Sequence, residues 1–379
     1  MKREAAIVGI GRTAYSRNSG KTTLAMAVEA TRDALADAGL SMMDVDGMVA
    51  FGAGDSVSTG AVGYALGLDG LYFQSDVMGG GNVAALVMSQ AFMAVESGNC
   101  DVAVVYRSLN SRSGHRFGTF AGPIRAGGSA QFSAPHGYMV PGQWFAMWAR
   151  RHMHTYGTTN DDFGAIATTY RSHALNNPHA IARTPLSLEE YHESRWVMEP
   201  FHIYDCALEA DGACALVVTT RDRARDLKHR PVRLLEHVGY TGKAGLNDQW
   251  DDMTRMYSAF VAPRLWDRTG LQPSDMDFAC LYDCFTYTAL ATTEDYGFCE
   301  KGEAGQFYRG GRATYGGDLV INPHGGLLSE GYIHGLNHHY EAVLQLRGEA
   351  GVRQVEESAL CLVSAGAAAY GSALVYAGD

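Results

Sequence analysis

Apolar positions recur with helical spacing over residues 22–38, and the pattern stops at Gly39. A glycine directly after such a pattern is typical of a helix C-terminus, so we predict a helix that ends there. A polar loop follows, and the apolar run at residues 48–51 then predicts a buried strand. The same order returns later in the chain, where Gly270 precedes a polar loop and the apolar run 278–281. The chain therefore reads as a duplication.

The repeated pattern predicts two similar halves, at about residues 1–225 and 226–379. Further strands are expected at residues 5–10, 101–105 and 215–219, and a further helix at about residues 83–96. Strands that alternate with helices indicate an α/β protein, with mainly parallel sheets that helices cover on both faces.

The uncharged stretch at residues 358–378 is long enough to be considered as a membrane span. Glycine and serine interrupt it at Ser364, Gly366, Gly371 and Ser372. This composition fits two buried strands joined by a tight turn better than a helix that faces lipid. We therefore expect a buried C-terminal hairpin.

Composition narrows the classes of function. The chain has 379 residues, of which 46% are hydrophobic and 19% charged, so it can bury a large core. Its formal net charge of −11 disfavours a general binder of nucleic acid or of anionic membranes, because such binders need a basic face. We expect neither partner for this protein.

The cysteines indicate a reducing compartment. Their number is odd, most have apolar neighbours, and no Cys-x-x-Cys pair occurs among residues 100, 206, 214, 280, 284, 299 and 361. Such cysteines are typical of reduced core thiols and not of disulfides or zinc ligands. The first residues also lack the apolar core of a signal peptide, so a cytoplasmic location is expected.

Two short segments carry the candidate chemistry. Residues 325–335 read GGLLSEGYIHG and resemble the Gly-Gly-x-x-x-x-Gly-His-Pro loop of thiolases, with Tyr332 in the position of the histidine. Residues 282–285 read YDCF and resemble the Asn-Glu-Ala-Phe or His-Asp-Cys-Phe element of the same superfamily, with Tyr282 in the polar position. A tyrosine titrates near ~10 and a histidine near ~6.5, so the exchange indicates different chemistry.

The resemblance extends over nearly the whole chain and is closest to thiolases of the sterol-carrier-protein-X type. Within that type, residues 322–335 are similar to the steroid side-chain-cleaving aldolases. The resemblance implies an α/β thiolase fold with five layers, α-β-α-β-α, built from the two duplicated halves. It also implies a loop domain at about residues 107–202 that cradles coenzyme A (CoA).

The same resemblance implies partners. We expect a homodimer core and a small OB-fold protein with a zinc ribbon, together an α2β2 complex. Zinc is then expected only in that partner, and no metal or other cofactor in this chain. The phosphates of a CoA thioester substrate would meet basic residues of the loop domain, and the sequence does not choose among Arg112, Arg116, Arg125, Arg150, Arg151 and Arg171.

The departures from thiolases matter for the reaction. Thiolases keep a nucleophilic cysteine at the start of a helix, and counting back along the corresponding helix from Gly98 reaches Gly81. Their second cysteine lies in a Cys-x-Gly turn, which aligns with Ser364. Without either thiol, formation of an acyl-enzyme is not expected. The missing side chains at residues 79–81 are expected to widen the cleft for a bulky substrate such as a steroid.

A site that polarises a thioester can still stabilise an enolate, which is the leaving group of a retro-aldol cleavage. We assign Tyr282 to the enolate and Tyr332 to the proton of the β-hydroxyl, although the reverse assignment stays open. The products would be a ketosteroid and a short acyl-CoA such as propionyl-CoA. A tyrosine is more often a packing residue, and only the position of these two in matched loops favours catalysis.

Further residues are predicted to support substrate binding. His324 and His334 are candidate helpers, one of which Asp283 would orient, while Gly325 and Gly326 permit a tight turn and close approach of substrate. Two other functions stay open. The protein would be a thiolase or acyltransferase if Cys284, which we interpret as a core thiol, were a nucleophile. It would be a non-catalytic subunit that binds acyl-CoA or sterol if the chemistry has been lost.

Overall fold

The computed structural model describes residues 3–114, 116–117, 127–128, 130–245 and 250–379. Ten strands of these residues form one sheet. Their order across the sheet is β10 (Val320–Ile321), β9 (Phe278–Cys280), β11 (Leu360–Ala367), β12 (Tyr370–Gly378), β8 (Val232–Thr241), β1 (Ala5–Arg12), β7 (Asp211–Thr220), β4 (Val102–Asn110), β2 (Gly47–Gly52) and β3 (Phe73–Met78).

The two halves of the sheet have the same strand order when each half is read outward from the centre and its strands are ranked by their position in the chain: first, fifth, fourth, second and third. β1, β7, β4, β2 and β3 lie on one side, and β8, β12, β11, β9 and β10 lie on the other. The two sets join through two residue pairs between β1 and β8, Ala6 with Arg233 and Ile7 with Val232. The strand topology is thus duplicated, while the predicted boundary between residues 225 and 226 stays a prediction.

The prediction of mainly parallel sheets is wrong. β2 is parallel to β3 and β4, and β9 is parallel to β10 and β11. The central pairs from β4 through β7, β1, β8 and β12 to β11 are antiparallel. A strand covered on both faces is a continuous apolar run in either orientation, so its sequence does not reveal the direction of its neighbour.

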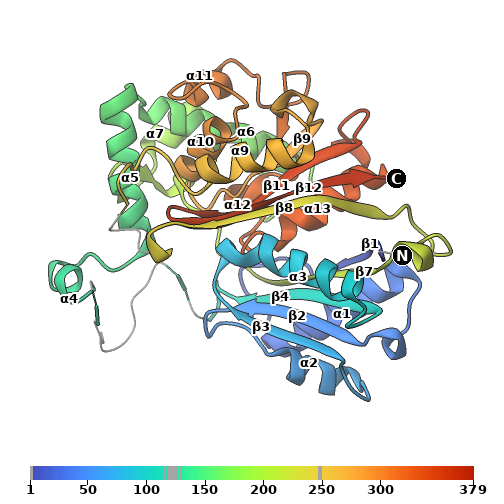
Figure 1. Cartoon of the computed structure of the whole chain (residues 1–379). Helices are drawn as coiled ribbons and strands as arrows, with labels where there is room; N and C mark the ends of the chain where they lie inside the picture. Colours follow the sequence, from blue (N-terminus) through green and yellow to red (C-terminus); the bar gives the residue numbers. More distant parts are fainter. Residues whose placement is uncertain (1–2, 115, 118–126, 129, 246–249) are drawn as a thin grey trace.

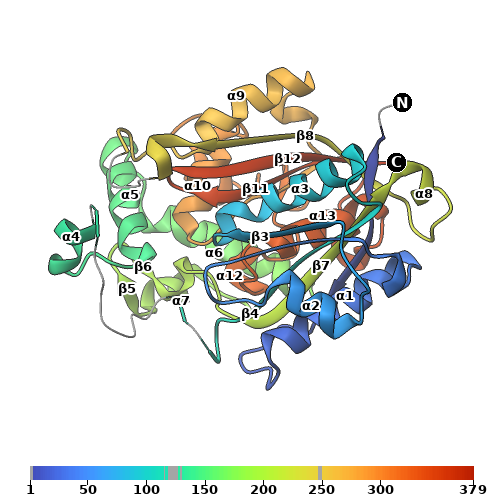
Figure 2. The same ribbon diagram turned by 60° about the horizontal axis from the view of Figure 1, so that its bottom comes forward.

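Helices complete five layers (Figure 1). α1 (Thr23–Ala38) and α2 (Thr59–Leu66) cover one outer face, and α9 (Ser258–Thr269) covers the opposite outer face. α3 (Ala84–Ser97) and α13 (Leu336–Arg347) lie between the two sets of strands and contact both (Figures 1 and 2). The predicted α-β-α-β-α arrangement is confirmed.

Local sequence explains where these elements begin and end. Thr22 caps α1, because its side chain accepts a hydrogen bond from the backbone N–H of Ala25, and Gly39 ends the helix with φ of 72°. The expected hairpin at residues 358–378 is formed by β11 and β12, which pair from Leu360 with Ala377 to Ala367 with Tyr370. No helix among the described residues is long and apolar enough to span a membrane.

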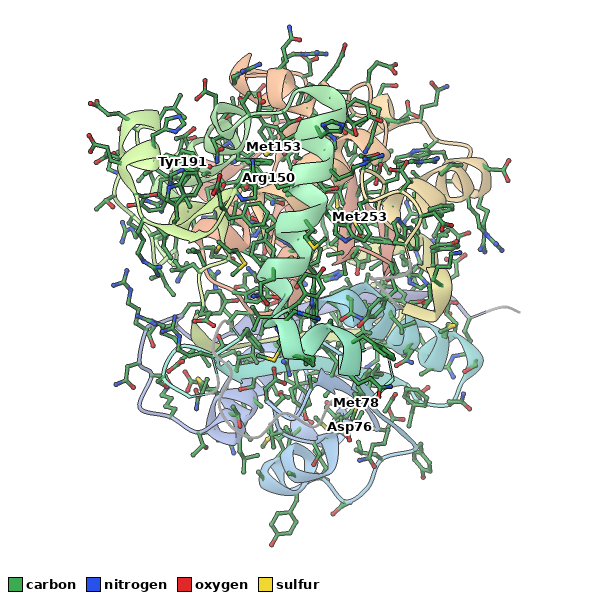
Figure 3. The ribbon with its side chains drawn as sticks, turned by 90° about the vertical axis from the view of Figure 1, so that its left-hand side faces the viewer. Asp76, Met78, Arg150, Met153, Tyr191 and Met253 are labelled. Atoms are coloured by element: carbon green, nitrogen blue, oxygen red, sulfur yellow. The ribbon has the colours of Figure 1, made fainter. Side chains whose placement is uncertain are left out.

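The predicted loop domain at about residues 107–202 contains helices that the sequence pattern did not predict. They are α4 (Ala130–Ser133), α5 (Pro141–Tyr156), α6 (Asn160–Leu175) and α7 (Leu188–Glu193), followed by the small sheet of β5 (Trp196–Met198) and β6 (Phe201–His202). α6 packs against α10 (Thr286–Asp295), α11 (Ala304–Arg309) and α12 (Gly326–Ser329). Figure 3 shows α5 with Arg150 and Met153 on the side of the molecule that faces the viewer. This segment therefore covers the loops that carry the candidate chemistry.

Candidate active site

The two predicted tyrosines meet directly. The hydroxyl oxygens of Tyr282 and Tyr332 lie 2.7 Å apart and form a hydrogen bond in which either can be the donor. Tyr282 follows β9 and Tyr332 follows α12, so tertiary structure joins residues that are fifty positions apart. The structure thus brings the pair together, and the separate catalytic roles stay predictions.

Hydrogen bonds from neighbouring strands fix the loop of Tyr282. The side-chain oxygen of Asn322 accepts from the backbone N–H of Leu281 at 2.8 Å, and its amide donates to the Leu281 carbonyl at 2.9 Å. The backbone N–H of Tyr282 donates to the hydroxyl of Ser364 at 3.0 Å. Ser364, which we expect at the position of the second thiolase cysteine, thus supports the backbone of Tyr282.

Asp283 holds the start of the other loop. Its carboxylate accepts hydrogen bonds from the backbone N–H groups of Leu327, at 2.9 Å, and Leu328, at 3.2 Å, which begin the short helix α12. Gly325 and Gly326 adopt φ of 101° and 64°, and a Cβ on Gly326 would come within 2.1 Å of the Asp283 carboxylate. Only glycine fits so close to that carboxylate in this backbone conformation.

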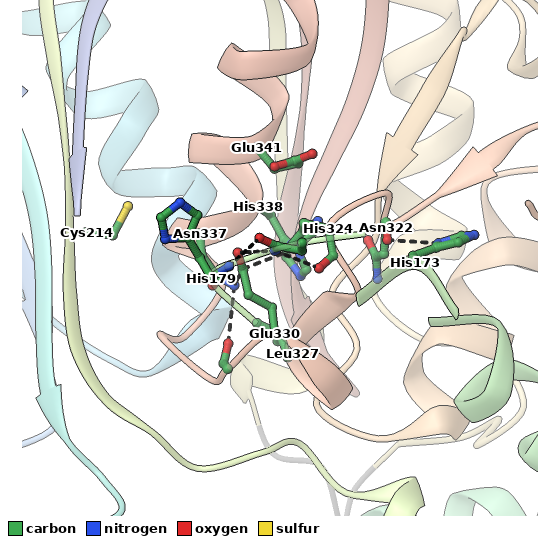
Figure 4. A network of polar contacts seen from close by, with 12 residues as sticks. His173, His179, Cys214, Asn322, His324, Leu327, Glu330, Asn337, His338 and Glu341 are labelled. Carbon is green, nitrogen blue, oxygen red and sulfur yellow. Dashed lines mark hydrogen bonds and ion pairs between the residues drawn. The ribbon is translucent and has the colours of Figure 1, made fainter. Parts of the chain in front are cut away.

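His324 belongs to a buried polar network behind the loop (Figure 4). His338 lies between two partners, with Nε2 at 3.2 Å from Asp283 and Nδ1 at 3.0 Å from Nε2 of His324. Burial and the neighbouring His338 hold the pKa of His324 well below its usual value, so its ring is neutral. Asp283 therefore orients His338, a residue that the sequence analysis did not name, and not His324 or His334.

Three residues of this network are close enough to hold a metal ion. The ligand atoms of Cys280, His324 and His338 all lie within 4.8 Å of one another, and all three residues are buried. The facing nitrogens of His324 and His338 already share a hydrogen bond. A role for this group in metal binding has no further support, and the absence of metal from this chain stays a prediction.

Glu330 connects the loop of Tyr332, in the second half of the chain, to residues of the first half. Its buried carboxylate accepts from Arg12 at 3.0 Å, from Asn177 at 2.9 Å and from Asn337 at 2.7 Å. Arg12 ends β1, so this ion pair joins the first strand of the chain to the loop of Tyr332. The sequence analysis did not name Arg12 as a site residue, because 318 positions separate it from Glu330.

His334 lies beside Tyr332, with ring centroids 4.8 Å apart. Its Nδ1 is 2.8 Å from a guanidinium nitrogen of Arg107, which also forms a 2.7 Å ion pair with Asp55. Burial, followed by the charge of Arg107, holds the pKa of His334 well below its usual value. His334 is therefore neutral and part of the site, whereas Arg107 and Asp55 were not predicted.

Tyr282 fills the space above Gly81. A Cβ built on Gly81 would lie 1.9 Å from the Tyr282 hydroxyl oxygen, and one on Gly79 would lie 2.9 Å from the side chain of Val83. The expectation that missing side chains widen the cleft is therefore wrong at Gly79 and Gly81 and stays a prediction at Gly80. The volume that a side chain at Gly81 would need belongs to the tyrosine.

Both phenols are protonated at neutral pH. Burial raises the pKa of Tyr282 well above its usual value, and the neighbouring Tyr332 adds to this shift. Burial also raises the pKa of Tyr332, against a smaller lowering by the hydrogen bond from Tyr282 and by the charge of Arg107. The arrangement can pass a proton along the hydroxyl pair without a stable tyrosinate.

A surface cavity of about 400 Å³ lies along α5. It is lined by His136, Tyr138, Gln143, Ala146, Met147, Arg150, Met198 and Glu199. Of the basic residues considered for CoA phosphates, Arg150 lines this cavity, Arg171 is buried and donates to Ser329 and to the Thr184 carbonyl, and Arg125 lies outside the described residues. Arg171 thus supports the loop of Tyr332.

The fold and the paired loops define a thiolase-type protein, and comparison with known proteins agrees. Residues 243–377 match the family described as thiolase C-terminal domain-like. The chain is 44% identical over 385 residues to the 17-hydroxy-3-oxo-4-pregnene-20-carboxyl-CoA lyase of Mycobacterium tuberculosis, with 98% of each chain covered. It is 42% identical over 385 residues to the steroid side-chain-cleaving aldolase of Thermomonospora curvata, covering 99% of this chain and 98% of the relative.

Solved structures give the same result. The protein superposes on the Ltp2-ChsH2(DUF35) aldolase with a TM-score of 0.92 at 41% identity, covering 99% of this chain and 98% of that chain. It also matches the acetyl-CoA acetyltransferase of Syntrophomonas wolfei with a TM-score of 0.74 at 16% identity, which shows the fold alone. The chain therefore belongs to the thiolase-like family that contains the side-chain-cleaving aldolases.

Proposed function

We propose that this protein is a retro-aldolase that cleaves a carbon–carbon bond in the side chain of a steroid β-hydroxyacyl-CoA. The products are a ketosteroid and a short acyl-CoA such as propionyl-CoA. The observation that carries this proposal is the 2.7 Å hydrogen bond between the hydroxyls of Tyr282 and Tyr332, next to Gly81. Relatives at 44% and 42% identity named as a carboxyl-CoA lyase and a steroid side-chain-cleaving aldolase support it.

The hydroxyl pair suits a proton relay. The β-hydroxyl of the substrate gives its proton to the oxygen of Tyr332, Tyr332 passes its own proton to Tyr282, and Tyr282 gives its own proton to the enolate carbon in the same concerted step. The carbon–carbon bond breaks, its electron pair becomes the new C–H bond at the enolate carbon, and the β-carbon becomes the ketone carbon. Each tyrosine ends with one proton, as it began. Because both phenols stay neutral, their raised pKa values do not oppose the reaction.

The environment of the thiols disfavours the acyltransferase alternative. Burial raises the pKa of the Cys284 thiol to about 12, so almost none of it is thiolate at neutral pH. We infer that Gly81 and Ser364 stand where thiolases keep their cysteines and that this enzyme works without either thiol. Iodoacetamide should therefore leave its activity unchanged, whereas inactivation with alkylated Cys284 would support the acyltransferase.

The partner proposed for this chain is a small OB-fold protein with a zinc ribbon, in an α2β2 complex around a homodimer. A similar solved structure is named as a complex of Ltp2 with ChsH2(DUF35). Among the described residues, β3 forms an outer edge of the sheet and one row of its backbone groups has no strand partner, which suits pairing with a second copy. Native mass spectrometry of the co-expressed proteins should give the α2β2 mass, and a 1:1 mass would contradict this stoichiometry.

The test of the proposed function is a cleavage assay. The chain, co-expressed with its zinc-ribbon partner, is supplied with a steroid thioester of CoA that carries a β-hydroxyl. Wild-type protein should release ketosteroid and short acyl-CoA, detected by mass spectrometry. Tyr332→Phe and Tyr282→Phe should each lower kcat by roughly 100-fold or more, the usual scale for loss of a general acid or base.

Tyr64→Phe is the control, because Tyr64 is 89% exposed on α2, and this variant should cleave like wild type. Full activity in Tyr332→Phe would overturn the assignment of the tyrosines. Tight binding of the thioester without any cleavage by wild type would instead favour the non-catalytic binding subunit.

A further inference from the structure

Arg107 places a buried positive charge beside the tyrosine pair. The residue is fully buried, and its guanidinium contacts three groups. One terminal nitrogen donates to the Phe51 carbonyl at 2.6 Å, and the other lies 2.7 Å from Asp55 and 2.8 Å from Nδ1 of His334. The side chain of Asp55 is also buried, with 4% of its surface exposed. The three side chains form one fixed unit.

The contact with Arg107 decides which nitrogen of His334 carries the proton. A guanidinium has only donors, so Nδ1 of His334 must accept the hydrogen bond. A neutral imidazole that accepts at Nδ1 carries its proton at Nε2. Burial and the charge of Arg107 keep the ring neutral by lowering its pKa. His334 is therefore locked as the tautomer that donates from Nε2.

This N–H lies over the glycine segment of the site. The Cε1 and Nε2 atoms of His334 are 3.5 Å and 3.8 Å from the position of a Cβ on Gly80. The corresponding position on the next residue, Gly81, lies 1.9 Å from the Tyr282 hydroxyl oxygen. Gly80 thus lies beside the His334 ring and Gly81 beside the Tyr282 hydroxyl, so two consecutive glycines bring the N–H donor and the hydroxyl pair close together.

We propose that the Nε2–H of His334 donates to the thioester oxygen of the substrate as the enolate forms, and that Arg107 and Asp55 are positioning residues that fix its tautomer. This inference rests on the proposed function. In that reaction the tyrosine hydroxyls transfer protons, so the oxygen that gains negative charge needs a separate donor. A preorganised N–H in a buried site, with a guanidinium behind it, stabilises such charge without reorganisation.

The test compares two substitutions of His334 in the co-expressed complex. The amide nitrogen of glutamine can reach the position of Nε2, whereas that of asparagine can reach only the position of Nδ1. The backbone of His334 has φ of 52°, which asparagine tolerates better than glutamine. A purely structural role therefore predicts that His334→Asn is the more active variant, and donation from Nε2 predicts the reverse.

We expect His334→Gln to keep kcat within roughly 10-fold of wild type and His334→Asn to lose roughly 100-fold or more, with little change in KM for either. Equal activity of the two variants, or higher activity of His334→Asn, would overturn the proposal. If wild type itself cleaves no steroid thioester, the proposed function fails.

A second measurement tests whether Arg107 fixes the tautomer of His334, and it does not require an active protein. In protein labelled with [15N]histidine, the signal of His334, identified by its loss in His334→Gln, should show protonated Nε2 and unprotonated Nδ1. Arg107→Met should shift this signal towards a mixture of tautomers. Protonated Nδ1 in wild type, or an unchanged signal in Arg107→Met, would overturn the role of Arg107.

Discussion

Gly81 and Tyr282 depend on each other at the scale of single residues. The hydroxyl of Tyr282 occupies the space in which any side chain on Gly81 would begin. A cysteine at this position and a tyrosine at residue 282 therefore exclude each other sterically. The glycine before α3 thus leaves room for the phenol that meets Tyr332.

Gly81→Ala should displace Tyr282, because the added Cβ has no room beside the hydroxyl. Such overpacking costs about 1–3 kcal/mol in the free energy of unfolding, and kcat for cleavage should fall by roughly 100-fold. Gly70→Ala is the matched control, since nothing lies within 4 Å of a Cβ built there. Urea denaturation and the cleavage assay measure both effects. Identical behaviour of the two variants would contradict the steric argument.

The sequence was informative about residues that stand in a recognisable motif. Tyr282, Tyr332 and His334 could be named from their positions in two short segments, and the structure brings them together. Arg107 and Arg12 could not be named, because each reaches its partner across more than 200 positions of chain. Long-range ion pairs leave no local pattern, so only the fold identifies them.

At the scale of elements, the loop of Tyr332 is held by its connections to other parts of the fold. Asp283 binds the start of α12, and Glu330 binds Arg12 of β1 together with Asn177 and Asn337. These contacts draw on strands of both halves and on the segment after α6. The loop is therefore positioned by the assembled domain and not by its own sequence.

Arg12→Met should destabilise the protein strongly, because it leaves the buried carboxylate of Glu330 without its cation. Breaking a buried ion pair by removal of one partner costs about 3–5 kcal/mol. Arg225→Met is the control, since Arg225 and Asp222 form an exposed pair at 3.5 Å that should be worth less than about 1 kcal/mol. The free energy of unfolding in urea distinguishes them, and equal losses would refute a special role for Glu330.

At the scale of the whole molecule, buried thiols and phenols couple stability to alkaline pH. Burial raises the pKa of Cys100, Cys284 and Cys299 to about 12, and raises those of Tyr170, Tyr282 and Tyr376 well above the usual value. In the unfolded chain these groups ionise near ~8.5 and ~10. The folded protein therefore holds more protons than the unfolded chain above those values.

The sign follows from proton linkage. Stability from groups with raised pKa values is fully present below their unfolded values and is lost as pH rises above them. The free energy of unfolding should thus fall above about pH 8.5, by about 1.4 kcal/mol per pH unit for each group that ionises only on unfolding. Urea denaturation at neutral and alkaline pH measures it, with tyrosinate absorbance appearing only on unfolding. Constant stability up to about pH 11 would contradict the burial of these groups.

The sequence by itself determined the duplicated α/β architecture, the C-terminal hairpin and the pair of tyrosines, and its resemblance to thiolases implied the five layers. The architecture and the hairpin follow from local periodicity and from glycine at helix ends, and the tyrosines stand in short motifs, all of which operate within a few residues. Only the tertiary structure decided the strand directions at the centre of the sheet, the occupation of the space above Gly81 and the partner of His334. Each of these outcomes is a contact between residues far apart in the chain, and a local sequence pattern does not specify which distant segments pack together.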